Sequence, residues 1–377
     1  MTVFVEGNKY IIKGDKIYSF YDGVKHEVNL CEYQKVKNFL KKIKGDVFRS
    51  SKLNEIAKKN PSIKNIDILH EVLDDIEEYI PKYNRNSFYN NLESLNINIE
   101  NYQSLDNEKY WSAASYKPLS NKITLRGKTL HYSRDEAERL FIKQCEEVVN
   151  ECDMLSYEEI LNSIIKDNIV HELIHMASTS ADDYREIVWT GLDEHYYDGE
   201  YEEGYHKCFF INEGLTEIIT NDICKSDIGY HISGYKPEIR ITKQLIGLVG
   251  FNFIKDCYFN NKGLIPIKIK LDEYRDDIYF DFYKEMEDFC DNRYASHIIK
   301  IQDLLISYYE KALEEAYKEE DTNRVKELLN TLKNNLIDET FYESIDYIHS
   351  HDSINVYMTR ANNLISKYNA IQKIKKI

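Results

Sequence analysis

The chain has 377 residues, a formal net charge of −16, and a content of 42% hydrophobic and 30% charged residues, which is typical of a folded globular protein. The negative charge argues against nucleic-acid binding, and no apolar run approaches the ~20 residues of a membrane helix. Seven scattered cysteines without a Cys-x-x-Cys spacing favour free thiols in a reducing compartment. Because no secretory signal pattern opens the chain, we expect a cytoplasmic protein, with export by another route left open.

The first part of the chain divides into two predicted regions. Residues 1–30 alternate short β-like runs with the turn pairs Gly7-Asn8, Gly14-Asp15 and Asp22-Gly23. This pattern predicts a small β meander. Residues 31–115 have a mainly helical pattern, which predicts a helical N-terminal region.

The pattern is clearest in the middle of the chain. Residues 122–126 read as a strand, and Ser133 with Glu136 forms a capping box that opens a helix. Ser156 with Glu159 forms a second capping box, and the helix that follows it has a buried apolar face. The chain then becomes helical and strongly charged again toward its end.

The second capped helix contains the stretch His171-Glu172-Leu173-Ile174-His175. Residues four apart lie on one face of a helix, so His171 and His175 can bind the same metal ion. Glu172 lies about 100° further round the helix and is placed to act on a water at that metal. This arrangement of two ligands and a general base is typical of zinc metalloproteases.

A catalytic zinc needs a third protein ligand, and the segment Asn212-Glu213-Gly214-Leu215-Thr216-Glu217 offers candidates. Glu213 and Glu217 are four residues apart and share a helix face. One of them can bind the metal while the other accepts a hydrogen bond from the far nitrogen of a ligand histidine.

The two motifs together resemble those of the gluzincins, the thermolysin-like zinc peptidases. The resemblance covers roughly residues 120–250, and the strings HELIHMAS and NEGLTE also resemble uncharacterised proteins of low-GC Gram-positive bacteria. It implies that His171, His175 and Glu213 bind one Zn²⁺ and that Glu172 is the base. Glu217 and Asn212 would then support the metal ligands by hydrogen bonds without binding the metal themselves.

The resemblance also implies an α+β fold with a zincin-like catalytic core. That core would hold a small mixed sheet with an edge strand beside the HExxH helix, followed by a helical lobe. We expect it at residues 116–260, with a helical region at 31–115 before it and another at 261–377 after it. The strand at residues 123–125 is a candidate for the edge on which an extended peptide adds as a further strand.

The link from His175 to Glu213 is longer than in thermolysin and contains an acidic, aromatic stretch at residues 189–206. Such a loop could form a lid or rim of the cleft, and it leaves Glu194 or His195 as alternative ligands. Glu213 is preferred because a helix holds a ligand more firmly than a loop does. His195 itself, and likewise His206, is expected to be a surface loop residue, and His349 and His351 are expected to be solvated.

In the resembling families a downstream Tyr or His stabilises the oxyanion. Tyr235 and His231, just before a helix begun by Pro237, are the candidates for this role here. The expected activity is hydrolysis of a peptide or protein substrate by a metal-activated water, with no nucleic acid or membrane as partner. Two alternatives stay open: a zincin-fold binding or regulatory protein with little turnover, and an effector protease with one protein target, as the clostridial neurotoxins are.

Overall fold

The structure is a computed structural model of the whole chain. It describes residues 2–5, 8–13, 16–21, 24–28, 76, 79, 80, 88, 91, 92, 94–100, 114–126, 157–182, 187–196, 205–207, 209–224, 235–344 and 351–374. The chain divides into two compact units, Met1–His70 and Glu71–Ile377. The four regions predicted from the sequence stay a prediction beside this division. The helix predicted after Ser133 and most of the predicted helical region 31–115 lie outside the described residues.

The first unit contains the predicted meander. Four strands pair in sequence order, each antiparallel to the next, and the turn pairs seen in the sequence lie between them or at their ends. Tyr10 and Ile17 are buried in this sheet. The strands are β1 (Thr2–Val5), β2 (Asn8–Lys13), β3 (Lys16–Tyr21) and β4 (Val24–Glu27).

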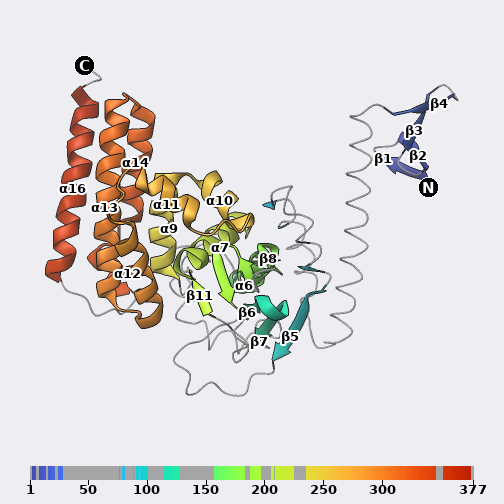
Figure 1. Cartoon of the computed structure of the whole chain (residues 1–377), viewed down its shortest axis with the longest axis horizontal. Coiled ribbons are helices and arrows are strands. Elements are labelled where there is room, and N and C mark those ends of the chain that lie inside the picture. The colour runs from blue at the N-terminus through green and yellow to red at the C-terminus, as the bar shows by residue number, and fades with distance from the viewer. Residues whose placement is uncertain are drawn as a thin grey trace. The chain divides into compact units, whose positions relative to one another are not determined.

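A small mixed sheet belongs to the second unit (Figure 1). Its order is β5-β7-β6, in which β5 runs parallel and β6 antiparallel to β7. β5 falls in the region predicted as helical, which corrects that prediction for these residues. Asn121, in the left-handed region with φ 44, makes the tight turn from β6 back to β7. The elements are β5 (Asn96–Glu100), β6 (Ala114–Lys117), the short 3-10 helix η2 (Pro118–Ser120) and β7 (Lys122–Arg126).

The position of β7 within this sheet differs from the prediction. The strand has the predicted bounds, but it is paired on both sides, with β5 along its whole length and with β6 over residues 122–125. Residues 123–125 are therefore not an open edge, and that prediction is wrong. β6 is an outer strand of the described sheet and packs against helix α6 (Tyr157–Ala177).

Two buried helices, α6 and α7 (Phe209–Cys224), lie at the centre of the second unit (Figure 1). α6 begins one residue after Ser156, as the capping box predicts, and Ile169 and Leu173 are buried on it. Gly214 allows α7 to approach α9 (Lys236–Val249) closely. A Cβ atom at Gly214 would lie 2.4 Å from the Thr242 hydroxyl, so a larger residue would force the two helices apart.

A four-stranded antiparallel sheet follows α6 directly, in the order β11-β10-β9-β8. It replaces part of the predicted acidic loop, while residues 197–204 of that stretch lie outside the described residues. Gly191, with φ 63, makes the turn between β9 and β10, where a Cβ atom would lie 2.3 Å from the Tyr258 ring. The strands are β8 (Thr179–Asp182), β9 (Ile187–Thr190), β10 (Asp193–Tyr196) and β11 (Tyr205–Lys207).

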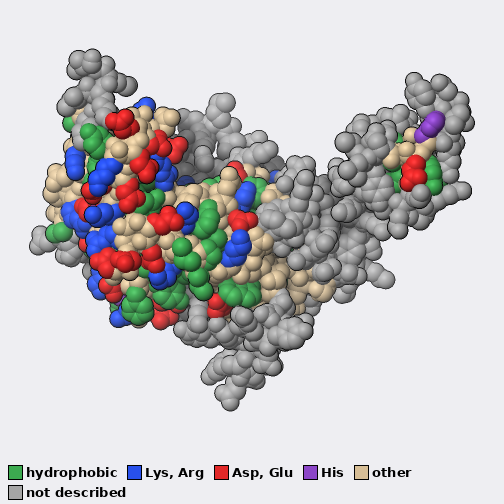
Figure 2. Space-filling model, turned by 45° about the horizontal axis from the view of Figure 1, so that its top comes forward, with side chains coloured by type: hydrophobic (Ala, Val, Ile, Leu, Met, Phe, Trp, Pro, Cys, Tyr) green, Lys and Arg blue, Asp and Glu red, His purple; other side chains and the backbone are tan. Residues whose placement is uncertain are grey.

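The end of the chain is helical, as predicted. Leu305, Tyr308 and Leu313 are buried on the long helix α13, which packs against α14 and α16 (Figure 1). Arg360 of α16 pairs with Asp303 of α13, and Figure 2 shows acidic and basic side chains interspersed over these helices. The helices are α10 (Phe251–Phe259), α11 (Ile265–Asp272), α12 (Tyr279–Asn292), α13 (Ala295–Lys318), α14 (Thr322–Asn335), α15 (Glu339–Ser344) and α16 (His351–Ile374).

Two predictions drawn from composition can be compared with the described residues. Among the described residues, no helix combines the length and the apolar character that crossing a bilayer requires. In the described part of the chain, Cys224, Cys257 and Cys290 form no disulfide bond. Cys31, Cys145, Cys152 and Cys208 lie outside the described residues.

Candidate metal centre

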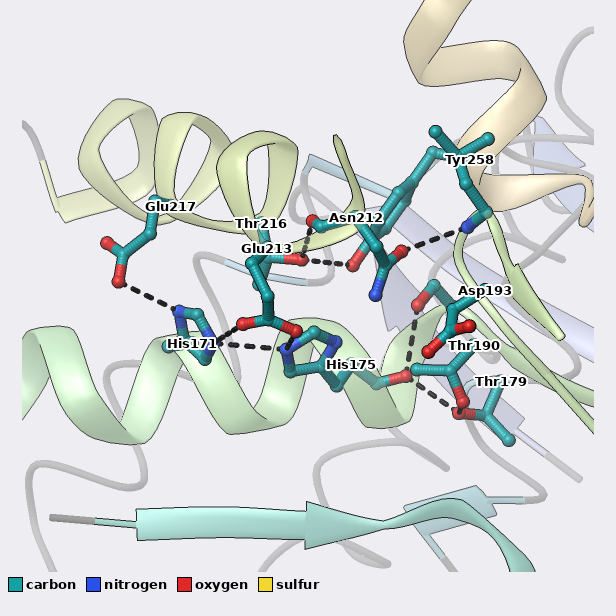
Figure 3. Close-up of polar contacts among 12 residues, drawn as sticks. His171, His175, Thr179, Thr190, Asp193, Asn212, Glu213, Thr216, Glu217 and Tyr258 are labelled. Carbon is teal, nitrogen blue, oxygen red and sulfur yellow. Dashed lines mark hydrogen bonds and ion pairs between the residues drawn. The ribbon is translucent and has the colours of Figure 1, made fainter. Parts of the chain in front are cut away.

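Three predicted ligands meet at the interface of α6 and α7. The two Nε2 atoms of His171 and His175 are 3.0 Å apart. The carboxylate of Glu213 reaches across from α7, with Oε2 3.1 Å from Nε2 of His171 and Oε1 3.3 Å from Nε2 of His175 (Figure 3). All three residues are buried, with 8%, 7% and 5% of their surface exposed. Two nitrogen donors and a carboxylate that converge in this way could hold a metal ion.

The local sequence explains this convergence. The spacing of four residues puts both histidines on one face of α6, and the helix turns that face toward α7. The C-terminal end of α6 is fixed by side chains that donate hydrogen bonds to carbonyl groups in and just after its last turn. The hydroxyl of Thr179 donates to the carbonyl of His175 at 2.8 Å, and the amide of Asn91 donates to the carbonyls of Met176 and Thr179 at 2.9 and 2.8 Å.

Glu217 lies one turn after Glu213 and contacts the outer side of His171. Its Oε1 is 3.3 Å from Nδ1 of His171, and both side chains are largely buried (Figure 3). A carboxylate at Nδ1 fixes the orientation of the ring and leaves Nε2 to face the cluster. The sequence predicts such a supporting role for Glu217, and it stays a prediction.

Asn212 has a different place from the one predicted. It was expected to support the metal ligands, but its Oδ1 accepts a hydrogen bond from the backbone N–H of Leu192 at 3.0 Å. Leu192 lies in the turn between β9 and β10, so Asn212 ties that hairpin to the first turn of α7. Its effect on Glu213 is therefore through the backbone of α7.

The charges of the cluster depend strongly on one another. Burial alone lowers the pKa of His171, but Glu217 and Glu213 outweigh it and hold this pKa well above its ordinary value. Burial alone raises the pKa of Glu213, but His175 and His171 outweigh it and lower this pKa below its usual range. His171 and Glu213 therefore each favour the charged form of the other.

Glu172 is the buried neighbour of the first ligand. Only 7% of its surface is exposed, and this burial raises the pKa of its carboxyl, an effect that His171 and His175 oppose. A carboxylate with a raised pKa is a better proton acceptor than an ordinary one. The role of general base stays a prediction for this residue.

Tyr235 immediately precedes α9, and its ring stacks on that of His171. The ring centroids are 5.9 Å apart and the planes differ by 9°. Burial, together with Glu213 and Glu172, raises the pKa of Tyr235 well above its ordinary value, so its hydroxyl stays protonated. His231, the other candidate for oxyanion stabilisation, lies outside the described residues.

The alternative ligands lie elsewhere. Glu194 and His195 are on β10, and neither belongs to a cluster of potential ligands among the described residues. The prediction that His195 is a surface loop residue is wrong, because it is 4% exposed and its Nε2 lies 3.3 Å from Oδ2 of the buried Asp193. His206 is on β11 and His351 begins α16, while His349 lies outside the described residues.

Two residues that support the site could not be identified from the sequence alone. Asn91 lies 85 residues before Met176, and Glu238 follows Tyr235 by three residues on α9. Neither has a local pattern that would mark it, because an isolated Asn or Glu gives no sign of its long-range partner.

A comparison of the chain with protein-family models, with curated proteins and with solved structures found no match.

Proposed function

We propose that this protein is a zinc-dependent peptidase of gluzincin type. The observation that carries the proposal is the geometry of the three donors. Ligand distances of about 2.0–2.1 Å around a tetrahedral zinc ion put neighbouring donor atoms about 3.3 Å apart. The separations among Nε2 of His171, Nε2 of His175 and the Glu213 oxygens are 3.0, 3.1 and 3.3 Å, which suits such an ion.

The donor set supports zinc over harder metals. Two imidazoles and one carboxylate form the set found in catalytic zinc sites, whereas Mg²⁺ and Ca²⁺ prefer all-oxygen sets. A zinc ion bound there would polarise the carbonyl of the scissile peptide bond and lower the pKa of the attacking water. His171, His175 and Glu213 hold it, and Glu217 keeps His171 in the orientation that this requires.

The remaining groups handle the proton and the substrate oxygen. The Glu172 carboxylate accepts a proton from the attacking water and passes it to the amide nitrogen as the C–N bond breaks. The Tyr235 hydroxyl, held protonated, donates a hydrogen bond to the carbonyl oxygen as negative charge develops on it. Because β7 is a central strand, the proposed place for an extended peptide moves to β6, an outer strand of the described sheet that packs against α6.

Glu172→Gln tests the proposal directly. The variant is expected to bind one zinc per chain, measured by elemental analysis, and to lose cleavage of a mixed peptide library by a factor of about 10²–10⁴. Asp222→Asn is the matched control, because it removes an exposed carboxylate from α7 without contact to the cluster. A protein without bound zinc but with intact histidines would refute the metal site.

The same assay separates the two alternatives. Stoichiometric zinc without any chelator-sensitive cleavage would favour a binding or regulatory protein. Cleavage of one protein at one site, with general peptides untouched, would favour an effector protease. Buried Glu172 beside the ligands favours catalysis, because a site that only holds a metal does not need a buried carboxylate there.

A further inference from the structure

The first turn of α9 contacts both helices of the metal centre. Tyr235 stacks on His171 of α6. Three residues later, the backbone carbonyl of Glu238 packs against Gly214 of α7, where a Cβ atom would lie 2.5 Å from that oxygen. Gly214 directly follows the ligand Glu213 in the chain. The position of this turn therefore determines the position of the Tyr235 ring relative to His171.

The side chain of Glu238 fixes the turn from the other side. It is fully buried, and its Oε1 accepts a hydrogen bond from Nη1 of Arg293, the residue that follows α12. Arg293 has a left-handed backbone with φ 56, its N–H caps α12 at the carbonyl of Phe289, and its guanidinium lies over the Phe289 ring at 5.0 Å. The cation is thus held in one place by its own backbone and by an aromatic ring.

The same end of α12 also reaches α7. The rings of Phe210 and Phe289 meet edge to face with their centroids 5.5 Å apart. One aromatic contact thereby joins α12 to α7, and one ion pair joins α12 to α9. We propose that the ion pair between Arg293 and Glu238 is a positioning device that holds Tyr235 against His171 at the metal centre.

The charges in this region explain why a positive group is placed there. Four carboxylates act on the phenol of Tyr235, namely those of Glu213, Glu172, Glu238 and Glu217. Glu213 belongs to the cluster, and Glu172 and Glu217 flank it. Burying Glu238 near them without a cation would leave its charge uncompensated. Replacing a buried ion pair by a well-packed apolar pair is often neutral for stability, so the geometry that this ion pair fixes explains it better than stability alone does. The effect of this ion pair on catalysis rests on the proposed peptidase activity, whereas its effect on the position of Tyr235 does not.

The test places 3-fluorotyrosine at position 235 of the full-length chain and records its ¹⁹F resonance with Co²⁺ as the metal. In the otherwise unchanged protein, the paramagnetic ion is expected to shift this resonance strongly. Arg293→Met should reduce the shift while one Co²⁺ per chain stays bound, and Arg293→Lys should keep most of it. Arg275→Met is the matched control, because it removes an exposed ion pair with Asp277 that does not touch the site.

A double variant separates position from folding. Glu238→Gln combined with Arg293→Met removes the buried carboxylate at position 238 together with its cation, so folding should recover while the resonance of residue 235 stays displaced. In kinetic assays Arg293→Met is expected to lower kcat by up to about 100-fold with little change in KM, because misplacing a group by about 1 Å can cost that much.

The outcomes separate this inference from the proposed function. A Co²⁺-induced shift that is the same in Arg293→Met and Arg275→Met would overturn the positioning role, as would a native protein that binds Co²⁺ without any shift at residue 235. A shift that depends on Arg293, in a protein that cleaves no peptide, would support the positioning role and refute the peptidase. If no Co²⁺ binds, the metal-free resonance compared between the same two variants gives the answer.

Discussion

The contact between Glu217 and His171 gives the sharpest prediction about metal binding. Glu217→Gln removes the carboxylate charge 3.3 Å from Nδ1 of His171 and keeps the size of the side chain. Both side chains are largely buried, so this close ion pair is screened much less by solvent and salt than a surface pair would be. We therefore expect zinc affinity to fall by about 10- to 100-fold, the range typical of lost supporting contacts to ligand histidines.

The assay is a competition titration of zinc between the protein and a chromophoric chelator. Asp222→Asn is the control, because it removes one negative charge from the same helix at an exposed position. Its affinity for zinc should equal that of the native protein. Equal affinities in Glu217→Gln and Asp222→Asn would refute the role given to Glu217.

The pH dependence of this effect has a defined sign. Zinc competes with the proton on His171, and Glu217 raises the pKa of that imidazole in the metal-free protein. Glu217→Gln lowers this pKa, so the variant loses less of its affinity to protonation as the pH falls. The affinity gap between variant and native protein should thus be largest above both pKa values and should narrow at lower pH. A gap that widens on acidification would contradict the assigned charges.

Three further predictions concern the supports of the site. Asn91→Ala removes one hydrogen bond to the end of α6 and one to the start of β8, so it is expected to lower the free energy of unfolding by about 1–3 kcal/mol, measured in urea. The control Asn292→Ala loses one exposed hydrogen bond within its own helix and should change this free energy little. Gly214→Ala forces α7 away from α9, so it should lower the free energy of unfolding by about 1–3 kcal/mol and weaken zinc binding. A native-like free energy of unfolding and zinc affinity would contradict the close packing. Removal of zinc by a chelator should lower Tm, since zinc at about 1,000 times its Kd stabilises by about 4 kcal/mol.

The helices that carry the cluster could be predicted because their signals are local. The spacing of His171 and His175, the apolar face of α6 and the capping box at its start all act within a few turns of one helix. The same is true of Glu213 and Glu217 on α7. These residues meet in the structure because each helix presents one polar stripe to the other.

The order of the strands could not be predicted, because pairing joins distant segments. The bounds of β7 were correct, but its two neighbours come from residues 96–100 and 114–117, and the first of these lies in a region with a mainly helical pattern. His195 shows the same limit for burial. A strand as rich in charge as residues 193–196 looks like a loop, and only its pairing with β9 and β11 buries Asp193 and His195.

The C-terminal helices matter for the site in a way that the sequence motifs do not indicate. Those motifs end near residue 217, yet α12 lies beyond residue 278 and contacts both α7 and α9. Phe289 packs on the helix that carries Glu213, and Arg293 neutralises the acid that anchors the turn bearing Tyr235. A shift of α12 would therefore reach the third ligand and the tyrosine together. If Arg293 positions Tyr235 as proposed, the C-terminal helices act on the candidate metal centre through this residue.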